Sequence, residues 1–304
     1  MLETRNLTKT FRKFIAVDNL NIHVQKGDIY GFLGPNGAGK TTTIGMLSGL
    51  IRPTSGTAIV NGLELSDFNN IKKNIGVYPQ ESNFYPNRSA KNHMLLFGSL
   101  KGLNKVQALS ESVRLLQLVG LHDSEDVKVG NFSHGMKKRL GIAQALIGNP
   151  ELLILDEITN GIDPLWAKQV RDLITELNKD GITIIISSHN LFEIQQICNR
   201  VGIIHKGQLV AEDDIDLIEN NIETESIITV GIHNLSLKMV EWVKQMKYVR
   251  KVEQIDGNKL LVYANSRHDI RSDIIHGLVS VGADIFELNE KSRSLEDIFI
   301  HLTT

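Results

Sequence analysis

A glycine-rich run, placed between an apolar segment and a helix-forming one, constrains this chain more than any other feature. It follows the apolar residues Ile29–Leu33. The run itself reads Gly34-Pro35-Asn36-Gly37-Ala38-Gly39-Lys40-Thr41-Thr42. Small residues spaced as G-x-x-x-x-G-K-[ST] let backbone N–H groups surround phosphate oxygens. The pattern predicts a strand, a phosphate-binding loop, and a helix over Lys40–Leu47 whose positive end faces the anion.

Two side chains at the end of this loop carry specific chemistry. Lys40 would place a positive charge against the β- and γ-phosphates, and the Thr41 hydroxyl would be a ligand of Mg²⁺. The alternative is a glycine-rich surface turn that matches the spacing by chance. A strand before the loop and a helix after it disfavour that alternative.

Composition narrows the class of protein to which the chain can belong. Its 304 residues leave room for two domains, and 33 Lys and Arg against 35 Asp and Glu make a formal net charge of −2. Without a global positive field, nucleic acid is not an expected partner. Cys198 is the only cysteine, which excludes an internal disulfide and is typical of a reducing compartment. No segment has the apolar length that spans a bilayer, so we expect a cytoplasmic protein that meets the membrane only through a partner.

Short continuous apolar runs recur along the first 220 residues. They lie at residues 29–33, 58–60, 152–155, 183–187 and 201–204. Runs without alternation are typical of strands buried on both faces of a largely parallel sheet. Between residues 87 and 150, leucines and valines recur at helical spacing instead. We therefore expect an α/β domain over residues 1–220 that contains a helical subdomain at about 87–150.

Two adjacent carboxylates follow the apolar run at residues 152–155. In enzymes with a phosphate loop, such a strand lies beside the loop, so Asp156 is predicted to hold Mg²⁺. Glu157, one residue further on, could orient or deprotonate the water that attacks the γ-phosphate. The alternative for Asp156 and Glu157 taken alone is an ordinary strand end with solvated charges.

A second candidate anion-binding helix begins at Ser133. That side chain can cap a helix whose first amides point outward. The alternative is a simple capped helix with a basic turn. With all three motifs in this order, the chain resembles the ATP-binding cassette (ABC) family of P-loop ATPases, whose serine-glycine signature Ser133 and Gly135 match. The signature departs from LSGGQ at Phe132, His134 and Met136, and the residue after Glu157 is isoleucine where the family usually has proline. None of these changes removes a charge, a Mg²⁺ ligand or the proposed base.

The resemblance implies further site residues. Phe11 matches the aromatic residue that stacks on adenine, and Val17 the apolar residue beside it. Gln80 matches the glutamine that contacts Mg²⁺ or water, Asp163 the aspartate of the loop at the dimer interface, and His189 the histidine that contacts the γ-phosphate. Each has an ordinary alternative when taken singly, such as a core position for Phe11, a polar loop for Gln80 or a strand end for His189.

The resemblance also implies how such a chain works. Two cassettes, in the simplest case a homodimer, would pack head to tail, so that the loop at residues 34–42 of one copy and Ser133 and Gly135 of the other enclose a shared ATP with Mg²⁺. Catalysis would fall to Glu157, His189 and Lys40. A separate membrane permease would dock near Gln80. An importer subunit and a non-transport, ATP-dependent regulator remain alternatives.

Beyond residue 221 the order of predicted elements changes to βαββαβ. We expect strands near 227–232, 249–255, 259–264 and 285–290, with amphipathic helices after the first and third of them and a terminal helix from Ser294. This order predicts a ferredoxin-like accessory domain over residues 221–304. A packing or dimer-supporting module is the favoured role, with a ligand sensor as the alternative. Together with the form of the signature, the accessory domain resembles the tails of drug, bacitracin-type or lantibiotic-type peptide exporters.

Overall fold

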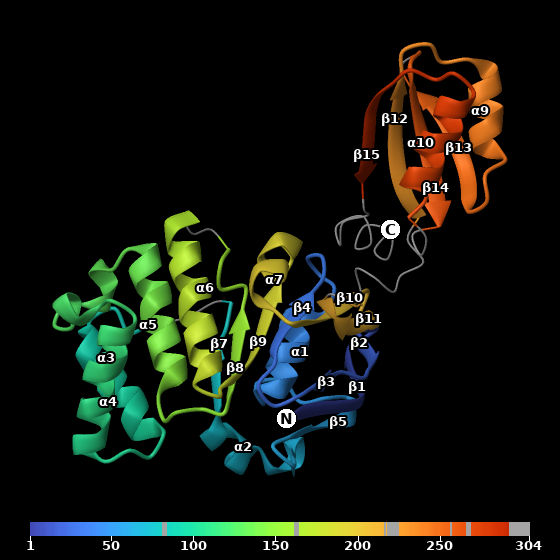
Figure 1. Ribbon diagram of the computed structural model, residues 1–304. Coiled ribbons are helices and arrows are strands. Elements are labelled where there is room, and N and C mark those ends of the chain that lie inside the picture. Colours follow the sequence, from blue (N-terminus) through green and yellow to red (C-terminus); the bar gives the residue numbers. More distant parts are fainter. Residues whose placement is uncertain are drawn as a thin grey trace. The chain divides into compact units, whose positions relative to one another are not determined.

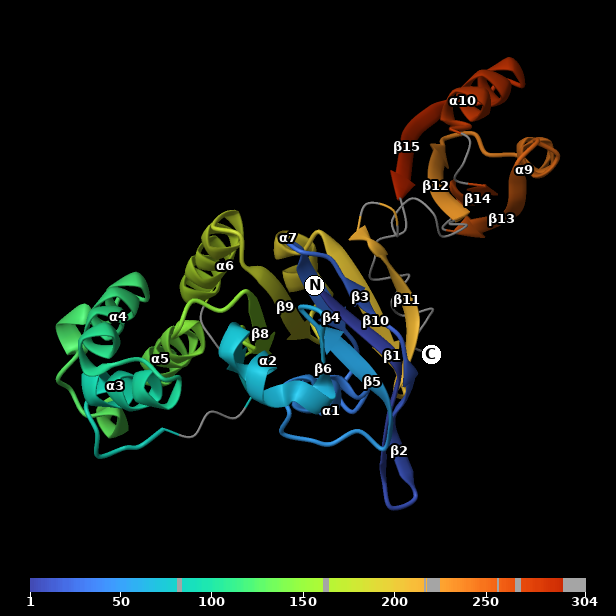
Figure 2. The ribbon, with the colours of Figure 1, turned by 90° about the horizontal axis from the view of Figure 1, so that it is seen from below.

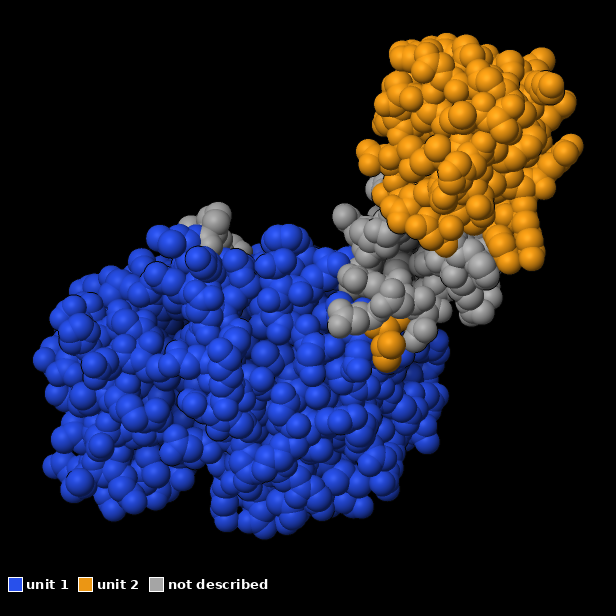
Figure 3. Space-filling model, viewed as in Figure 1, with its two compact units in different colours: residues 1–215, 303 blue, residues 216–302, 304 orange. Residues whose placement is uncertain are grey.

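The computed structural model describes residues 1–80, 84–160, 164–215, 217, 225–255, 257–265 and 269–291. The chain divides into two compact units, the first formed by residues 1–215 and the second beginning after residue 215 (Figure 3). Each unit has its own hydrophobic core.

A six-stranded sheet forms the centre of the first unit (Figure 1). All pairings in it are parallel except the one between β10 and β11. The strands β4, β8 and β9 are buried along their whole length, as the unbroken apolar runs predict. In order across the sheet, the strands are β11 (Gln208–Asp214), β10 (Arg200–His205), β4 (Ile29–Leu33), β9 (Thr183–Ser188), β8 (Leu152–Asp156) and β7 (Ile75–Tyr78).

A second, antiparallel sheet corrects one prediction. The run at residues 58–60 belongs to β5 in this sheet, where it pairs with β1 and β6, and not to the parallel sheet. Its three residues are too few to show that exposure alternates along β5. The outer position of the parallel sheet is taken instead by β7, which the sequence did not mark as a strand. The antiparallel strands are β1 (Leu2–Phe11), β2 (Phe14–Leu20), β3 (His23–Val24), β5 (Ser55–Val60) and β6 (Leu63–Glu64).

Buried side chains of the two sheets and of the helix after the phosphate loop form one core. Figure 2 shows both sheets of the first unit together with this helix, α1. The expected helical subdomain is present as α3, α4 and α5, which gather on one side of the parallel sheet (Figure 1). Short 3₁₀ turns lie at Leu65–Asp67, His122–Ser124 and Val129–Asn131. The helices are α1 (Lys40–Leu47), α2 (Phe68–Asn74), α3 (Ala90–Leu100), α4 (Lys105–Leu118), α5 (His134–Leu146), α6 (Pro164–Lys179) and α7 (Leu191–Ile197).

The second unit has the ferredoxin-like order that the sequence predicts. Its antiparallel sheet runs β13-β14-β12-β15, with the first and last strands of the motif side by side. The expected terminal helix from Ser294 lies outside the described residues. The elements are β12 (Glu225–Ile232), α9 (Leu237–Lys244), β13 (Val249–Ile255), β14 (Lys259–Asn265), α10 (Arg271–Ser280) and β15 (Ile285–Lys291).

Candidate functional site

The glycine-rich loop leaves the carboxyl end of β4 and enters α1 directly. Gly37 and Gly39 have φ values of +81° and +109°, which residues with a Cβ rarely adopt. A Cβ on Gly39 would lie 2.5 Å from the carbonyl oxygen of Ala16, and one on Gly34 would lie 2.5 Å from that of Ile204. The loop therefore needs glycine at positions 37 and 39 for its backbone conformation. It needs glycine at positions 34 and 39 because a Cβ would collide with a neighbouring carbonyl oxygen.

A pocket of about 400 Å³ opens beside this loop. It combines the loop with side chains that follow two strands of the parallel sheet, because the carboxyl ends of parallel strands meet at one edge. The antiparallel sheet supplies the rest of its wall. The lining residues are Phe14, Ala16, Asn36, Gly37, Gly39, Lys40, Thr41, Thr42, Gln80, Glu157 and Asn160.

Lys40 connects the loop to the carboxylate at the end of β8. Its buried ammonium group donates to the carbonyl oxygens of Gly34 at 2.7 Å and Pro35 at 3.3 Å. It also lies 3.3 Å from Oε1 of Glu157, and both side chains are 5% exposed. The positive charge thus stands within the pocket, where an anionic ligand would be attracted.

Glu157 pairs with a second predicted residue. Its Oε2 lies 2.8 Å from Nδ1 of His189, which therefore carries a proton toward the carboxylate. The backbone of Glu157 is left-handed, with a φ of +50°. Its N–H group donates to Oγ of Ser187 at 3.1 Å and to the carbonyl of the same residue at 3.2 Å. A buried carboxylate between an ammonium and an imidazole can accept a proton from water.

The neighbouring residues have the oxygen atoms that Mg²⁺ prefers. Oδ1 of Asp156 accepts a hydrogen bond from Ser187, whereas its buried Oδ2 has no hydrogen-bond partner among the described residues. Burial raises the pKa of Asp156, and the hydrogen bond from Ser187 opposes that rise. The Thr41 hydroxyl donates to Oε1 of Gln80 at 3.3 Å. An unpaired carboxylate oxygen, a hydroxyl and an amide oxygen fit a hard cation.

Ser133 and Gly135 are not among the residues that line this pocket. Ser133 is the N-cap of α5, and its Oγ accepts from the N–H group of Met136 at 3.2 Å, as predicted. It is exposed, and among the described residues only Trp166 would come within 4.0 Å of a Cβ on Gly135. In the described part of the chain, the start of α5, which the sequence predicts to be a second anion-binding helix end, is exposed and lies outside the phosphate-loop pocket.

The antiparallel sheet places its aromatic residues differently from the sequence expectation. Phe11 is 45% exposed, with the Lys9 ammonium 4.9 Å from its ring centre, and does not line the pocket. Phe14, its partner across the β1–β2 hairpin, is 64% exposed and does line it. Val17 is fully buried in the core, so it can support the pocket wall but cannot touch a ligand.

Phe14, Ala16 and Asn160 are the pocket residues that sequence reasoning missed. The aromatic character of Phe14 was a visible signal, but the register of a hairpin cannot be read from three or four residues. The predicted interface residue Asp163 lies outside the described part of the chain.

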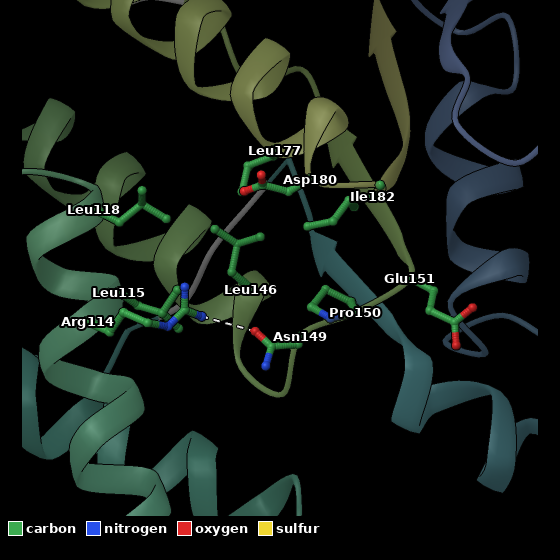
Figure 4. A pocket seen from close by; sticks show the side chains of 11 residues that line it. Arg114, Leu115, Leu118, Leu146, Asn149, Pro150, Glu151, Leu177, Asp180 and Ile182 are labelled. Atoms are coloured by element: carbon green, nitrogen blue, oxygen red, sulfur yellow. Dashed lines mark hydrogen bonds between the residues drawn. The ribbon is translucent and has the colours of Figure 1, made fainter.

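Another pocket, of about 310 Å³, lies between the helical subdomain and the opposite end of the parallel sheet (Figure 4). The guanidinium group of Arg114 reaches Asn149 at 3.0 Å on its rim. Leucines from α4, α5 and α6 form its apolar part. None of the predicted site residues that the structure describes lines it, so it is separate from the phosphate loop.

Comparison with known proteins finds extensive similarity. The family described as ABC transporter matches residues 17–160. The bacitracin transport ATP-binding protein BcrA of Bacillus licheniformis is 40% identical over 304 residues, which cover 99% of this chain and 97% of that one. The lantibiotic transport ATP-binding protein SrtF of Streptococcus pyogenes is 40% identical over 220 residues, 72% of this chain and 93% of that one. The cassette MJ0796, solved as a dimer with ADP and Pi, has a TM-score of 0.66 at 23% identity and covers 70% of this chain and 98% of that chain.

Proposed function

This chain belongs to the ABC transporter family as an ATP-hydrolysing subunit, and we propose that it powers the export of a drug or an antimicrobial peptide through a separate membrane permease. The relatives named for bacitracin and lantibiotic transport support this class of cargo. In the described residues, no helix is both long and apolar enough to cross a membrane. In this proposal the cargo passes through the permease, and the permease holds this subunit at the cytoplasmic, inner face of the cell membrane.

The observation that carries the proposal is the contact of Glu157 with both Lys40 and His189 beside the phosphate loop. Glu157 accepts a proton from the attacking water, and the His189 ring holds that carboxylate in place. Lys40 offers its charge to the β- and γ-phosphates once the nucleotide enters, and the loop N–H groups bind the phosphate oxygens. Phe14 and Phe11 offer aromatic surface at the hairpin for the adenine ring.

Mg²⁺ would be held by Asp156, Thr41 and Gln80, and it would neutralise charge on the β- and γ-phosphates. Ser133 and Gly135, which lie outside the pocket of their own chain, would meet the triphosphate bound to a second copy, so the active form is a dimer of cassettes. Asp163 would lie at the interface between the two. ATP that contacts both copies favours the closed dimer, and hydrolysis removes that preference.

Glu157→Gln tests the assignment of the base. The variant keeps a side chain of the same shape but cannot take up a proton from water. We expect ATP turnover to fall by about 10²-fold or more, while ATP still binds. Turnover is measured by phosphate release and binding by a fluorescent ATP analogue, with Glu151→Gln as a control because Glu151 lies at the other end of β8. Unchanged turnover in Glu157→Gln would remove the catalytic assignment.

A further inference from the structure

A buried lysine joins helix α5, which begins after Ser133, to the turn that carries Glu157. Lys138 lies one turn into this helix and is 6% exposed. Its ammonium group donates to the carbonyl oxygen of Ile158 at 3.0 Å and to that of Asn160. A buried ammonium group is unfavourable unless it is paired or hydrogen-bonded. Lys138 is therefore held to this turn, and the turn is held to α5.

The turn needs such support because its backbone is strained. Glu157 has a φ of +50°, although it is neither a glycine nor an asparagine, the residues that adopt positive φ most readily. The Asn160 N–H group donates to the Glu157 carbonyl at 3.3 Å and closes the turn. Such conformations persist where neighbouring groups hold them in place. Both carbonyls that Lys138 binds belong to residues of this turn.

A carboxylate also holds this turn. The Thr159 hydroxyl donates to Oε2 of Glu193 on α7, and Ser188 donates to the same oxygen at 3.0 Å. Burial lowers the pKa of Lys138, and the nearby carboxylates of Glu193 and Glu157 oppose that fall. The turn is thus bound both by a cation on α5 and by an anion on α7, the helix that follows His189.

We propose that Lys138 is a positioning residue for ATP hydrolysis, which holds the Glu157 turn so that the carboxylate stays beside Lys40 and His189. The inference rests on the proposed role of Glu157 as the base. Lys138 does not line the phosphate pocket, so it acts through the turn and not by touching nucleotide. Because α5 starts at the Ser133 cap, one helix contributes to the site of a second copy and also holds the base of its own.

The test compares three variants of the full-length chain. Lys138→Met keeps an unbranched apolar stem without any donor, and Lys138→Gln keeps a neutral donor. Lys137→Met is the matched control, because Lys137 is the partly exposed neighbour on the same helix. For each variant, kcat and KM for ATP hydrolysis, the Kd of a fluorescent ATP analogue, and Tm are measured, and rates are expressed per folded molecule.

A small displacement of the base lowers the reaction rate but does not weaken the binding of ATP. Lys138→Met should therefore lower kcat by about tenfold or more. Its KM and Kd should stay within about twofold of the wild-type values. Lys138→Gln should be intermediate, and Lys137→Met should match wild type. A lower Tm with unchanged kcat per folded molecule would show a purely structural role and overturn the proposal. A rise in KM or Kd with unchanged kcat would overturn it too. The role of Glu157 as the base is tested separately, by the Glu157→Gln variant.

Discussion

At the scale of residues, several positions of the site have a left-handed backbone. The residue type decides how much free energy this conformation costs. Gly37 and Gly39 adopt positive φ without strain, because glycine has no Cβ. Glu157 adopts it with a side chain, at the position where the proposed chemistry needs a carboxylate. Conformations of this kind cost of order 1–3 kcal/mol and depend on surrounding contacts. Here, Ser187 and Lys138 supply these contacts.

Gly39→Ala should disable the phosphate loop. The new Cβ would meet both a φ of +109° and the Ala16 carbonyl at 2.5 Å, so the loop must shift away from its phosphate-binding shape. We expect ATP affinity to fall by about tenfold or more, in line with a strain of order 1–3 kcal/mol. Isothermal titration calorimetry with ATP checks this. Gly27→Ala is the control, since it shares a positive φ of +87° but no described residue lies within 4 Å of the added Cβ; equal loss of affinity in both variants would contradict the expected role of the Ala16 contact.

At the scale of elements, two helices of the second unit pack so closely that one of them has a glycine at the contact. On α10, Gly277 lies against the indole ring of Trp242 on α9, where an added Cβ would fall 1.5 Å from Cη2. A glycine inside a helix normally lowers its stability relative to alanine. In this helix, the Trp242 ring occupies the space that a Cβ at residue 277 would need, so packing favours the small residue.

Gly277→Ala should therefore destabilise the second unit, although alanine is the better helix former. Overpacking costs typically about 1–3 kcal/mol, which exceeds the gain of roughly 1 kcal/mol in helix propensity. Urea unfolding followed by tryptophan fluorescence measures the change in a Trp166→Phe background, where Trp242 is the only tryptophan. Ser272→Ala, at an exposed position of α10, should have little effect and serves as the control. Higher stability of Gly277→Ala would show that α9 and α10 are not packed so closely.

At the scale of the whole molecule, two separate cores divide the chain. One core unites both sheets of the first unit with α1, and the other lies within the βαββαβ unit. The similarity to SrtF covers 93% of that protein but only 72% of this chain, so more than a quarter of this chain lies outside that match. A unit with its own core can fold alone. We therefore assign nucleotide binding to the first unit by itself.

A fragment of residues 1–220 should fold and bind ATP within about threefold of the full-length affinity, because no described residue after 215 lines the phosphate pocket. Circular dichroism reports folding and titration with a fluorescent ATP analogue reports binding. The same fragment with Lys40→Ala controls for nonspecific binding. An unfolded fragment, or one that no longer binds ATP, would show that the accessory unit supports the cassette.

The sequence alone determined the elements whose signals are local. The strand β4, the phosphate loop and α1 follow from contiguous residues, and so does the capped start of α5, since apolar runs, glycine spacing and capping act over a few residues. The order βαββαβ was sufficient for the fold of the second unit, because each element has its own period and turn.

Only the tertiary structure decided which distant residues meet. A three-residue run cannot show whether it will join a parallel or an antiparallel sheet, and so 58–60 was assigned to the wrong one. Hairpin register turned Phe14 toward the pocket and left Phe11 outside its lining. Lys138 lies twenty residues from Ile158 and gave no signal, because the contact depends on how α5 packs against β7, the neighbour of β8 in the sheet. Contacts between residues far apart in the sequence depend on how the elements pack. Such contacts leave no pattern in a short stretch of sequence.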